Sequence, residues 1–553
     1  MKHVNRRDFI KQAGVAGIAT AVPGWAPLIL TPRRTTPRTE QGTVVFKPYY
    51  VQRGVGPNMD ATYGYASDTK WDAFHSDIHV APEAGLVISD TEGQDRFGVT
   101  VQWNVEGFGY LFITADNGGE FYSLPSSGQT KTYNLDYEFA KSRVMRNRRR
   151  MAKHNGGSFA PSRKLNALID VSEGYYEDAT RASDEWRRAE LAQRSLLNAM
   201  WAGETMEIEK ARQDILNHGT RDFFFGCDAR ALTQIDPDVV MECFEELFNY
   251  ATITHYLESG YQDFEPTQGN LKFNFRDAML DELRDAGMTV EGRPVFWPHE
   301  VVTPDWLRAL KYDDLLRYVE QHTRKVVGHY GDKMYAWEIV NEFHDWANEN
   351  NLSPEQTIEV TKLACDVAKD TAPNVQRLIN NCCPFAGYVQ QGENSGGKAI
   401  YPQRTPWEFM KDLTDAGVDY TISGVQMYFP YHDLQDTIIH IERFEQFGRP
   451  VQLTEVGASS GPSRRSVVLE TLPISDEPYV WHRGWDLELQ ADWVEGLYTL
   501  AYSKPWIEAS NWYDLDDDHA WIENGGLITS PDSKRKPAFY RLKKLQEEWR
   551  SLG

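Results

Sequence analysis

Two glutamates each follow a short apolar run, which is a placement that acid–base chemistry can use. Glu342 ends the run Trp337-Glu-Ile-Val-Asn341, and Glu455 ends the run Val451-Gln-Leu-Thr454. A carboxylate buried at a strand end is costly unless it has a partner or a function. Retaining glycoside hydrolysis needs two carboxyl groups about 5–5.5 Å apart, because one protonates the leaving oxygen while the other attacks the anomeric carbon. The pair is therefore a candidate for that reaction, although a lone glutamate at a strand end more often forms a structural ion pair.

Apolar runs and amphipathic helical patterns alternate after residue 218, and this alternation must position the two glutamates. Strand–helix alternation requires parallel strands with right-handed crossovers, and eight such units close a barrel whose chemistry lies at the C-terminal strand ends. We therefore predict an α/β chain with a (β/α)8 barrel over residues 218–553. The eight predicted strands are Phe223–Phe225, Ala251–Thr254, Val295–Trp297, Ala336–Val340, Arg377–Asn380, Ile422–Met427, Val451–Thr454 and Ala509–Trp512.

The strand ends resemble those of the family-ten glycoside hydrolases, which are mostly endo-β-1,4-xylanases. The three main motifs are Gly292-x-Pro-Val-x-Trp297, Trp337-x-x-Val-Asn-Glu342 and Gln452-Leu-Thr-Glu455. Further matches are Glu265-Pro266 before Gly269, Thr303-Pro-Asp-Trp306, Ser423-Gly-Val-Gln426 and Lys536-Pro-Ala-Phe-Tyr540. Together they cover residues 205–548 in order, which supports the barrel prediction.

The resemblance implies a role for each matching residue. Glu342 would be the general acid/base and Glu455 the nucleophile, and Asn341 would bind the sugar hydroxyl next to the reacting carbon. The sugar subsites would be lined by Trp297, Trp512 and Trp521. The implied activity is endo-cleavage of β-1,4 bonds in xylan or a related plant polysaccharide by double displacement. Cofactor fingerprints are missing from the sequence, and we expect a monomer with no cofactor and no metal ion. Such an acid needs a pKa raised toward about 6–7 by burial and by its carboxylate neighbour.

The chain departs from the family pattern around these residues. Arg293 stands where the family has His, and Gln426-Met427-Tyr428 replaces Gln-x-His, so that a His partner of the nucleophile becomes Tyr. The Asn and Lys that grip the sugar just beyond the cleavage site are absent from Leu257–Tyr261, and the longer segment Pro298–Val302 introduces His299. We therefore include four further residues as substrate-binding candidates: Arg293, His299, Gln426 and Tyr428.

These departures leave the glycan open, while the reaction machinery is kept. An arginine beside the subsites would favour an acidic or decorated sugar. One alternative is the same mechanism acting on xyloglucan, β-glucan or a glycoside. Another alternative is a non-catalytic glycan-binding protein, although such a protein would be free to lose either Glu342 or Glu455.

The N-terminus resembles a twin-arginine export signal. Asn5-Arg-Arg-Asp-Phe-Ile-Lys11 precedes the uncharged stretch Gln12–Thr31. That stretch could almost span a bilayer as an uncleaved anchor, but Pro23 and Pro27 argue against this. We expect residues 1–30 to be a signal peptide and 31–43 a linker, in a periplasmic or extracellular protein with no membrane partner after export.

Residues 44–165 have the period-two pattern of a small β-sandwich. Asp116-Asn-Gly-Gly119 is typical of a hairpin turn between strands. The domain could bind carbohydrate through exposed rings of Trp103, Phe108 and Tyr110, or it could be a packing domain with these rings in its core. The basic run Arg143–Arg150 is expected to be a solvated loop. Residues 166–217 are expected to form a helical connector, with one helix over Glu177–Leu216.

Composition excludes several other classes of protein. The 553 residues include 81 acidic and 58 basic side chains, a net charge of −23, which argues against a nucleic-acid partner. The five cysteines fit no zinc spacing. Gly457-Ala-Ser-Ser-Gly461 matches the esterase elbow, but it follows a barrel strand rather than a strand of an open hydrolase sheet.

Overall fold

The computed structural model describes residues 41–49, 64–81, 85–260, 262–428, 430–461 and 479–552. The expected signal peptide and nearly all of the linker (residues 1–40) lie outside the described residues. Within the described ranges, no helix has the length and apolar character needed to cross a membrane.

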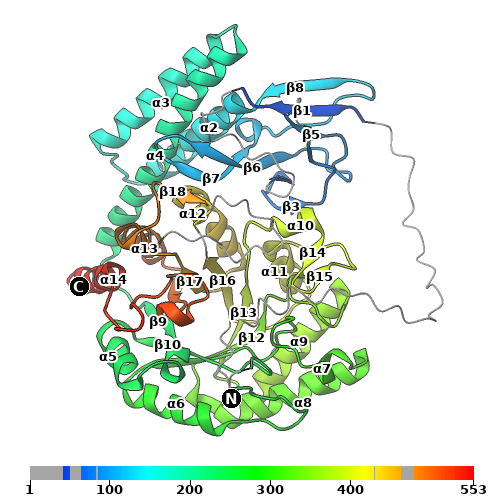
Figure 1. Cartoon of the computed structure of the whole chain (residues 1–553), viewed down its shortest axis with the longest axis vertical. Coiled ribbons are helices and arrows are strands. Elements are labelled where there is room, and N and C mark those ends of the chain that lie inside the picture. Colours follow the sequence, from blue (N-terminus) through cyan, green and yellow to red (C-terminus); the bar gives the residue numbers. More distant parts are fainter. Residues whose placement is uncertain are drawn as a thin grey trace, which may run out of the picture.

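Eight parallel strands close into a barrel below the N-terminal sheets in Figure 1. The strands are β9 (Phe224–Asp228), β10 (Tyr250–Thr254), β11 (Thr289–Arg293), β12 (Ala336–Asn341), β13 (Gln376–Asn381), β16 (Ile422–Tyr428), β17 (Val451–Gly457) and β19 (Ile507–Trp512). The main helices around them are α5 (Pro237–Leu247), α6 (Asn274–Asp285), α8 (Tyr312–Tyr330), α9 (Pro354–Thr371), α11 (Pro406–Asp415), α12 (Leu434–Glu442), α13 (Leu487–Tyr502) and α14 (Pro537–Arg550). The predicted (β/α)8 barrel is thus confirmed.

The third strand differs from the prediction. It runs over Thr289–Arg293, and the predicted segment Val295–Trp297 follows it as an extended continuation. This strand contains two charged residues, so it does not have the apolar pattern by which the other strands were predicted. Glu291 accepts a hydrogen bond from the Tyr250 hydroxyl at 2.6 Å, and Arg293 pairs with carboxylates, so both charges have partners inside the barrel.

Capping residues and prolines mark the start of several barrel helices. Ser353 and Gln356 form a capping box at the start of α9, and Thr405 and Glu408 form another at the start of α11. Proline occupies the first turn of both helices, where its missing N–H costs nothing. These caps fix where the chain turns from a strand-end loop into a helix.

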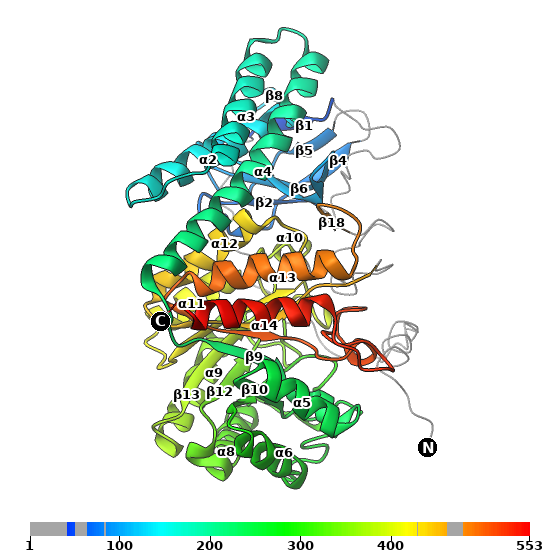
Figure 2. The same cartoon turned by 90° about the vertical axis from the view of Figure 1, so that its left-hand side faces the viewer.

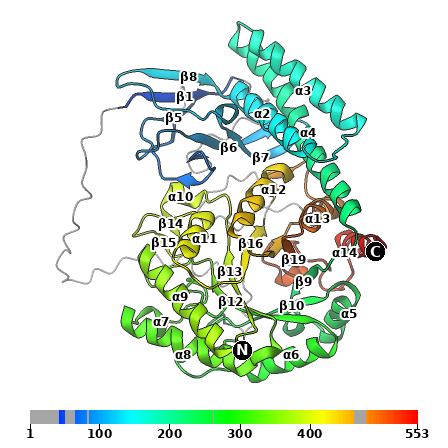
Figure 3. The ribbon, with the colours of Figure 1, turned by 180° about the vertical axis from the view of Figure 1, so that it is seen from behind.

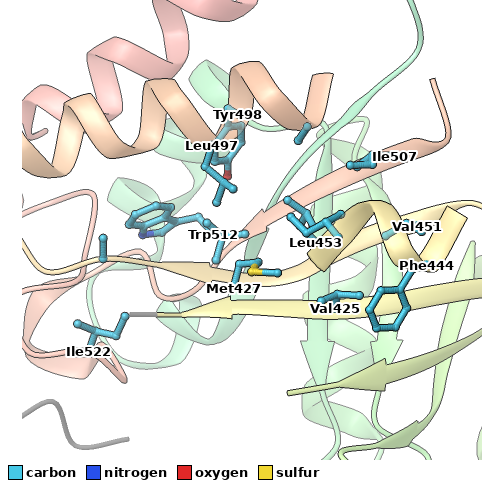
Figure 4. Packing of buried hydrophobic residues seen from close by; sticks show 14 of the residues in the cluster. Val425, Met427, Phe444, Val451, Leu453, Leu497, Tyr498, Ile507, Trp512 and Ile522 are labelled. Atoms are coloured by element: carbon cyan, nitrogen blue, oxygen red, sulfur yellow. The ribbon is translucent and has the colours of Figure 1, made fainter. Parts of the chain in front are cut away.

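Apolar side chains fill the layer between the last strands and α13 (Figure 4). Residues of alternating strand positions, such as Val451 and Leu453, face the same side and belong to one apolar cluster with Leu497 of α13. Trp512 lies in this layer, fully buried, and its indole N–H donates to the Gly525 carbonyl at 3.1 Å. This side chain therefore belongs to the core.

The N-terminal region is β-rich, as predicted, and consists of two sheets. One has the strand order β4-β5-β1-β8, and the other has the order β18-β7-β6-β2-β3. The strands are β1 (Thr43–Lys47), β2 (Gly64–Ser67), β3 (Ala73–Phe74), β4 (His79–Ala81), β5 (Gly85–Ile88), β6 (Gly98–Val105), β7 (Gly109–Ala115), β8 (Thr130–Asn134) and β18 (Val480–Trp481). Strand β18 comes from the segment after β17, so a barrel loop completes an N-terminal sheet.

The predicted hairpin turn is wrong, and of the two alternatives for the aromatic rings the packing domain is confirmed. The hairpin joins β6 to β7 through Glu106–Phe108, whereas Asp116 caps a short 3₁₀ turn over Asn117–Gly119 by accepting a hydrogen bond from the Gly119 N–H. The rings of Trp103, Phe108 and Tyr110 are no more than 6% exposed. Trp103 packs against Phe139, and Phe108 packs against Trp201. These rings are core side chains, because β6 and β7 are covered by helices.

The basic run is not a solvated loop. It forms part of α2 (Leu135–Asn155), which is followed by α3 (Arg163–Arg181) and α4 (Glu185–His218). The single helix expected over residues 177–216 is broken near Ala182, where Asp184 caps the start of α4. Figure 2 shows α4 running from the N-terminal sheets to the barrel.

Arginines of α2 connect the N-terminal region to the barrel. Arg143, Arg146 and Arg150 recur at helical spacing on one face of α2. Figure 3 shows α12 of the barrel on the side of α2 that faces the barrel. Arg143 pairs with Asp433, Arg146 with Asp436, and Arg150 with Glu442 at 2.6 Å. The run was predicted to be solvated because its partners lie almost 300 positions away in the sequence.

Candidate active site

Glu342 and Glu455 lie together at the C-terminal end of the barrel. Glu342 directly follows β12 and is 8% exposed, and Glu455 lies in β17 and is 5% exposed. The Gln426 amide donates to Glu342 Oε1 at 2.9 Å and to Glu455 Oε1 at 3.0 Å. These two oxygens are thus at most 5.9 Å apart, the sum of the two distances.

The environment of Glu342 favours its neutral form. Burial, and after it the charge of Glu455, raise its pKa to about 8, against hydrogen bonds from Gln426 and Trp297 that lower it. The Trp297 indole N–H donates to Glu342 Oε2 at 3.1 Å. The backbone of Glu342 is left-handed, with φ of 52°, and its N–H donates to the Asn380 carbonyl at 2.9 Å. Such a conformation in a non-glycine residue is typical of functional sites.

Glu455 is surrounded by hydrogen-bond donors. Arg293 and Tyr428 each donate to it, Asn380 donates to its Oε1 at 3.1 Å, and Gln426 donates to the same oxygen. Charge-assisted bonds of this kind hold a carboxylate in one position and stabilise its negative charge. Tyr428 thus contacts the carboxylate that the family's His would contact.

Arg293 lies beneath the pair and does not face the sugar subsites. It is 1% exposed, and its guanidinium also lies 3.5 Å from Glu338 Oε2 and over the Tyr513 ring. Burial raises the pKa of Glu338 well above its usual range, while Arg293 opposes that rise. The preceding Gly292 allows this packing, since a Cβ there would lie 2.4 Å from the Trp337 ring. The expectation that Arg293 contacts the sugar is therefore wrong.

A sequence model described as Glycosyl hydrolase family 10 matches residues 217–545. The chain belongs to this family. Endo-1,4-beta-xylanase B of Thermotoga neapolitana is 22% identical over 333 residues, covering 57% of this chain and 85% of that protein. Beta-1,4-xylanase of Dictyoglomus thermophilum is 27% identical over 292 residues, covering 49% and 75%. The solved structure of native xylanase 10B from Thermotoga maritima has 18% identity and a TM-score of 0.46, covering 62% of this chain and 98% of that one. This family 10 protein is a glycoside hydrolase that is endo-1,4-β-xylanase-like.

The remaining candidate residues of this family 10 enzyme fall into two groups. Asn341 lies beside the pair, and among the described residues its Nδ2 has no hydrogen-bond partner. The Trp297 ring lies 4.8 Å from that of His299, and Trp521 is half-buried. In contrast, Trp512 at the end of β19 does not line a subsite, because its side chain is fully buried in the layer between the strands and α13.

Several residues that contact the pair or lie beside it were not predicted as site residues from the sequence. Asn380 donates to both Glu338, at 2.8 Å, and Glu455. The hydroxyls of Tyr256 and Tyr513 are 3.0 Å apart, and they connect the ends of β10 and β19. The signal that could have found them is position, because each lies at or just after the end of a barrel strand, where this fold holds its chemistry.

Proposed function

We propose that this family 10 enzyme hydrolyses internal β-1,4 bonds of xylan by double displacement, with retention of configuration. The observation that carries the proposal is the shared Gln426 amide, which limits the two carboxylate oxygens to 5.9 Å. Retaining enzymes have carboxyl groups about 5–5.5 Å apart, whereas inverting enzymes need about 6.5–9.5 Å to admit a water molecule. The names of the family relatives support xylan as the substrate.

In the first step, Glu342 donates its proton to the glycosidic oxygen while Glu455 attacks the anomeric carbon. The bond from that carbon to the leaving oxygen breaks, and an ester forms between the sugar and Glu455. The raised pKa of Glu342, about 8, keeps it protonated at neutral pH for this task.

In the second step, the same residue acts as a base. Once Glu455 is esterified its negative charge is gone, and with it one of the two causes that raise the pKa of Glu342. The deprotonated Glu342 then takes a proton from water, which attacks the anomeric carbon and releases Glu455. Arg293 and Tyr428 stabilise the carboxylate as it leaves.

Arg293 forms ion pairs with Glu338 and Glu455. The guanidinium is therefore not available to bind an acidic sugar, and the preference for such a sugar loses its support. Another β-glycan cleaved by the same mechanism remains the second candidate, because the run Leu257–Tyr261 lacks the family's Asn and Lys. A purely glycan-binding role is disfavoured because Glu342 and Glu455 are both present and lie close together, bridged by the Gln426 amide.

We also infer export by the twin-arginine route from the paired Arg6 and Arg7, and a monomeric secreted enzyme whose partner is the polysaccharide. Replacing both arginines by lysine should keep the protein in the cytoplasm of an expressing bacterium. Normal export of that variant would overturn the inference.

The experiment is reducing-sugar release from xylan, mixed-linkage β-glucan and xyloglucan, with the product anomer followed by NMR. We expect β-anomer release from xylan that Glu455→Ala abolishes and that Glu291→Gln preserves. Glu291 is a matched control, because it is buried in the same barrel but bonded to Tyr250. An initial α-anomer would overturn retention, cleavage of another glycan alone would change the substrate, and binding without cleavage would favour the non-catalytic alternative.

A further inference from the structure

Tyr513 directly follows β19 and packs among the residues that surround the nucleophile. It is 4% exposed, and its backbone N–H donates to the Val456 carbonyl of β17 at 2.9 Å. Val456 is the residue after Glu455. This hydrogen bond therefore fixes the backbone of Tyr513 beside the strand that carries the nucleophile.

The Tyr513 ring contacts two of the side chains that donate to Glu455. The Arg293 guanidinium carbon lies 5.3 Å from the centroid of the ring. The Tyr428 ring lies 5.8 Å away, centroid to centroid, in an edge-to-face arrangement with an interplanar angle of 73°. Both kinds of contact are favourable, because the face of an aromatic ring carries partial negative charge and its edge partial positive charge. Arg293 and Tyr428 belong to different strands, β11 and β16, and Tyr513 connects them.

A second arginine also lies over the Tyr513 ring. The guanidinium carbon of Arg230 is 4.4 Å from the ring centroid. Arg230 pairs with Asp228 at 2.9 Å and also with Asp514, so its position is fixed by two carboxylates. The ring is therefore held by a second cation that has no contact with the nucleophile among the ion pairs of the described residues.

The hydroxyl of Tyr513 is used inside the protein. It lies 3.0 Å from the Tyr256 hydroxyl, and the Tyr256 ring packs 5.2 Å from the Trp297 ring, centroid to centroid. The Trp297 indole N–H donates to Glu342. The contacts of Tyr513 thus lead to both catalytic glutamates, and its hydroxyl is bonded to the protein.

We infer that Tyr513 is a positioning residue, which holds Arg293 and Tyr428 in the geometry in which both donate to Glu455. A ring suits this task, because it contacts the face of a guanidinium and leaves the N–H groups free to bond to carboxylates. A nucleophile that is held in place by fixed donors needs little rearrangement to reach the transition state. The inference rests on the proposed function, because it assigns Tyr513 to the step in which Glu455 attacks the sugar.

The first test is a pair of substitutions at Tyr513. Tyr513→Leu removes the ring and should lower kcat on xylohexaose about tenfold, while KM stays within about twofold, because the ring acts on the nucleophile and not on substrate binding. Tyr513→Phe keeps the ring and should restore kcat to within about threefold of the wild type. Tyr420→Leu is the matched control, since Tyr420 is buried just before β16, at the other end of the barrel, and also lies beside an arginine, Arg449. Equal losses of kcat in Tyr513→Leu and Tyr420→Leu would overturn the inference.

The second test measures the nucleophile directly. With 2,4-dinitrophenyl 2-deoxy-2-fluoro-β-xylobioside, Glu455 forms an ester with the anomeric carbon and dinitrophenolate leaves, without needing a proton from Glu342. The rate of dinitrophenolate release should fall about tenfold in Tyr513→Leu and stay at the wild-type value in Tyr420→Leu. A wild-type rate in folded Tyr513→Leu would overturn the inference.

A double-variant cycle shows whether Tyr513 acts through Tyr428. The loss of kcat in the combined variant Tyr513→Leu, Tyr428→Phe should be smaller than the product of the two single losses, because residues that act on one group are coupled. Losses that multiply would overturn the inference. A wild-type enzyme that neither hydrolyses xylohexaose nor releases dinitrophenolate would instead contradict the proposed function.

Discussion

Arg293 at the end of β11 donates a hydrogen bond to Glu455 on β17, although 162 positions separate the two residues in the sequence. The family resemblance places His at this position, so a permanent cation has replaced a group that titrates near neutral pH. Glu338 Oε2 lies 3.5 Å from the same guanidinium. The Arg293 guanidinium therefore holds the Glu455 carboxylate in position by a charge-assisted hydrogen bond.

Arg293→His should lower kcat on xylan about 10- to 100-fold with little change in KM, because a charge-assisted bond to the nucleophile is lost. Arg293→Lys should recover part of the loss. An unchanged kcat, or a loss confined to KM, would contradict this role.

The activity should fall as pH rises through about 8, because Glu342 must be protonated in the first step and its pKa is raised to about 8. The measurement is kcat/KM on xylohexaose from pH 4 to 10. Tyr428→Phe, which removes a hydrogen-bond donor to Glu455 and leaves the Gln426 and Trp297 donors to Glu342, should keep this alkaline limb. A fall in activity already below pH 6 would contradict the raised pKa of Glu342.

The Glu342→Gln variant should gain thermal stability over the wild type as pH rises. The pKa of Glu342 is raised on folding from 4.5 to about 8, so its favourable contribution is full below pH 4.5 and is lost as pH rises through 8. Glutamine carries no such cost. Calorimetric Tm values at pH 4.5 and 8.5 should therefore show a difference that widens in favour of the variant, and a constant difference would contradict the raised pKa.

Arg143→Ala should destabilise the whole protein by about 3–5 kcal/mol, because it leaves Asp433 buried and unpaired. Arg181→Ala is the control, since Arg181 is 70% exposed and its pairs are worth at most about 1 kcal/mol. Urea unfolding followed by tryptophan fluorescence and by circular dichroism should give coincident transitions in the wild type. Separate transitions for the N-terminal region and the barrel would show that α2 does not join them.

Trp512→Phe should lower Tm without changing KM for xylohexaose, because the indole packs among core residues and bonds to Gly525. Trp297→Phe should lower kcat instead, since the Trp297 indole N–H bonds to Glu342. An increase in KM for Trp512→Phe at unchanged Tm would place this ring in a subsite after all.

Local sequence patterns are enough to predict the barrel and the positions of the two glutamates. Strand and helix periods, turn residues and caps act over a few positions, so they predict the eight βα units and place Glu342 and Glu455 at strand ends. Tyr428 could be named as a contact of the nucleophile because it replaces a family residue at the same strand position. Asn380 could not, because an asparagine in a buried strand predicts no particular partner.

Only the tertiary structure decided which charges meet and which rings are buried. Closure of the barrel sets the register that brings Arg293 to Glu455 and turns Trp512 outward into the helix layer. Packing of α2 against α12 converts a basic run into buried ion pairs. The physical reason is that burial and pairing depend on surfaces contributed by segments far apart in the chain, and the periodicity of one segment contains no information about its distant partners.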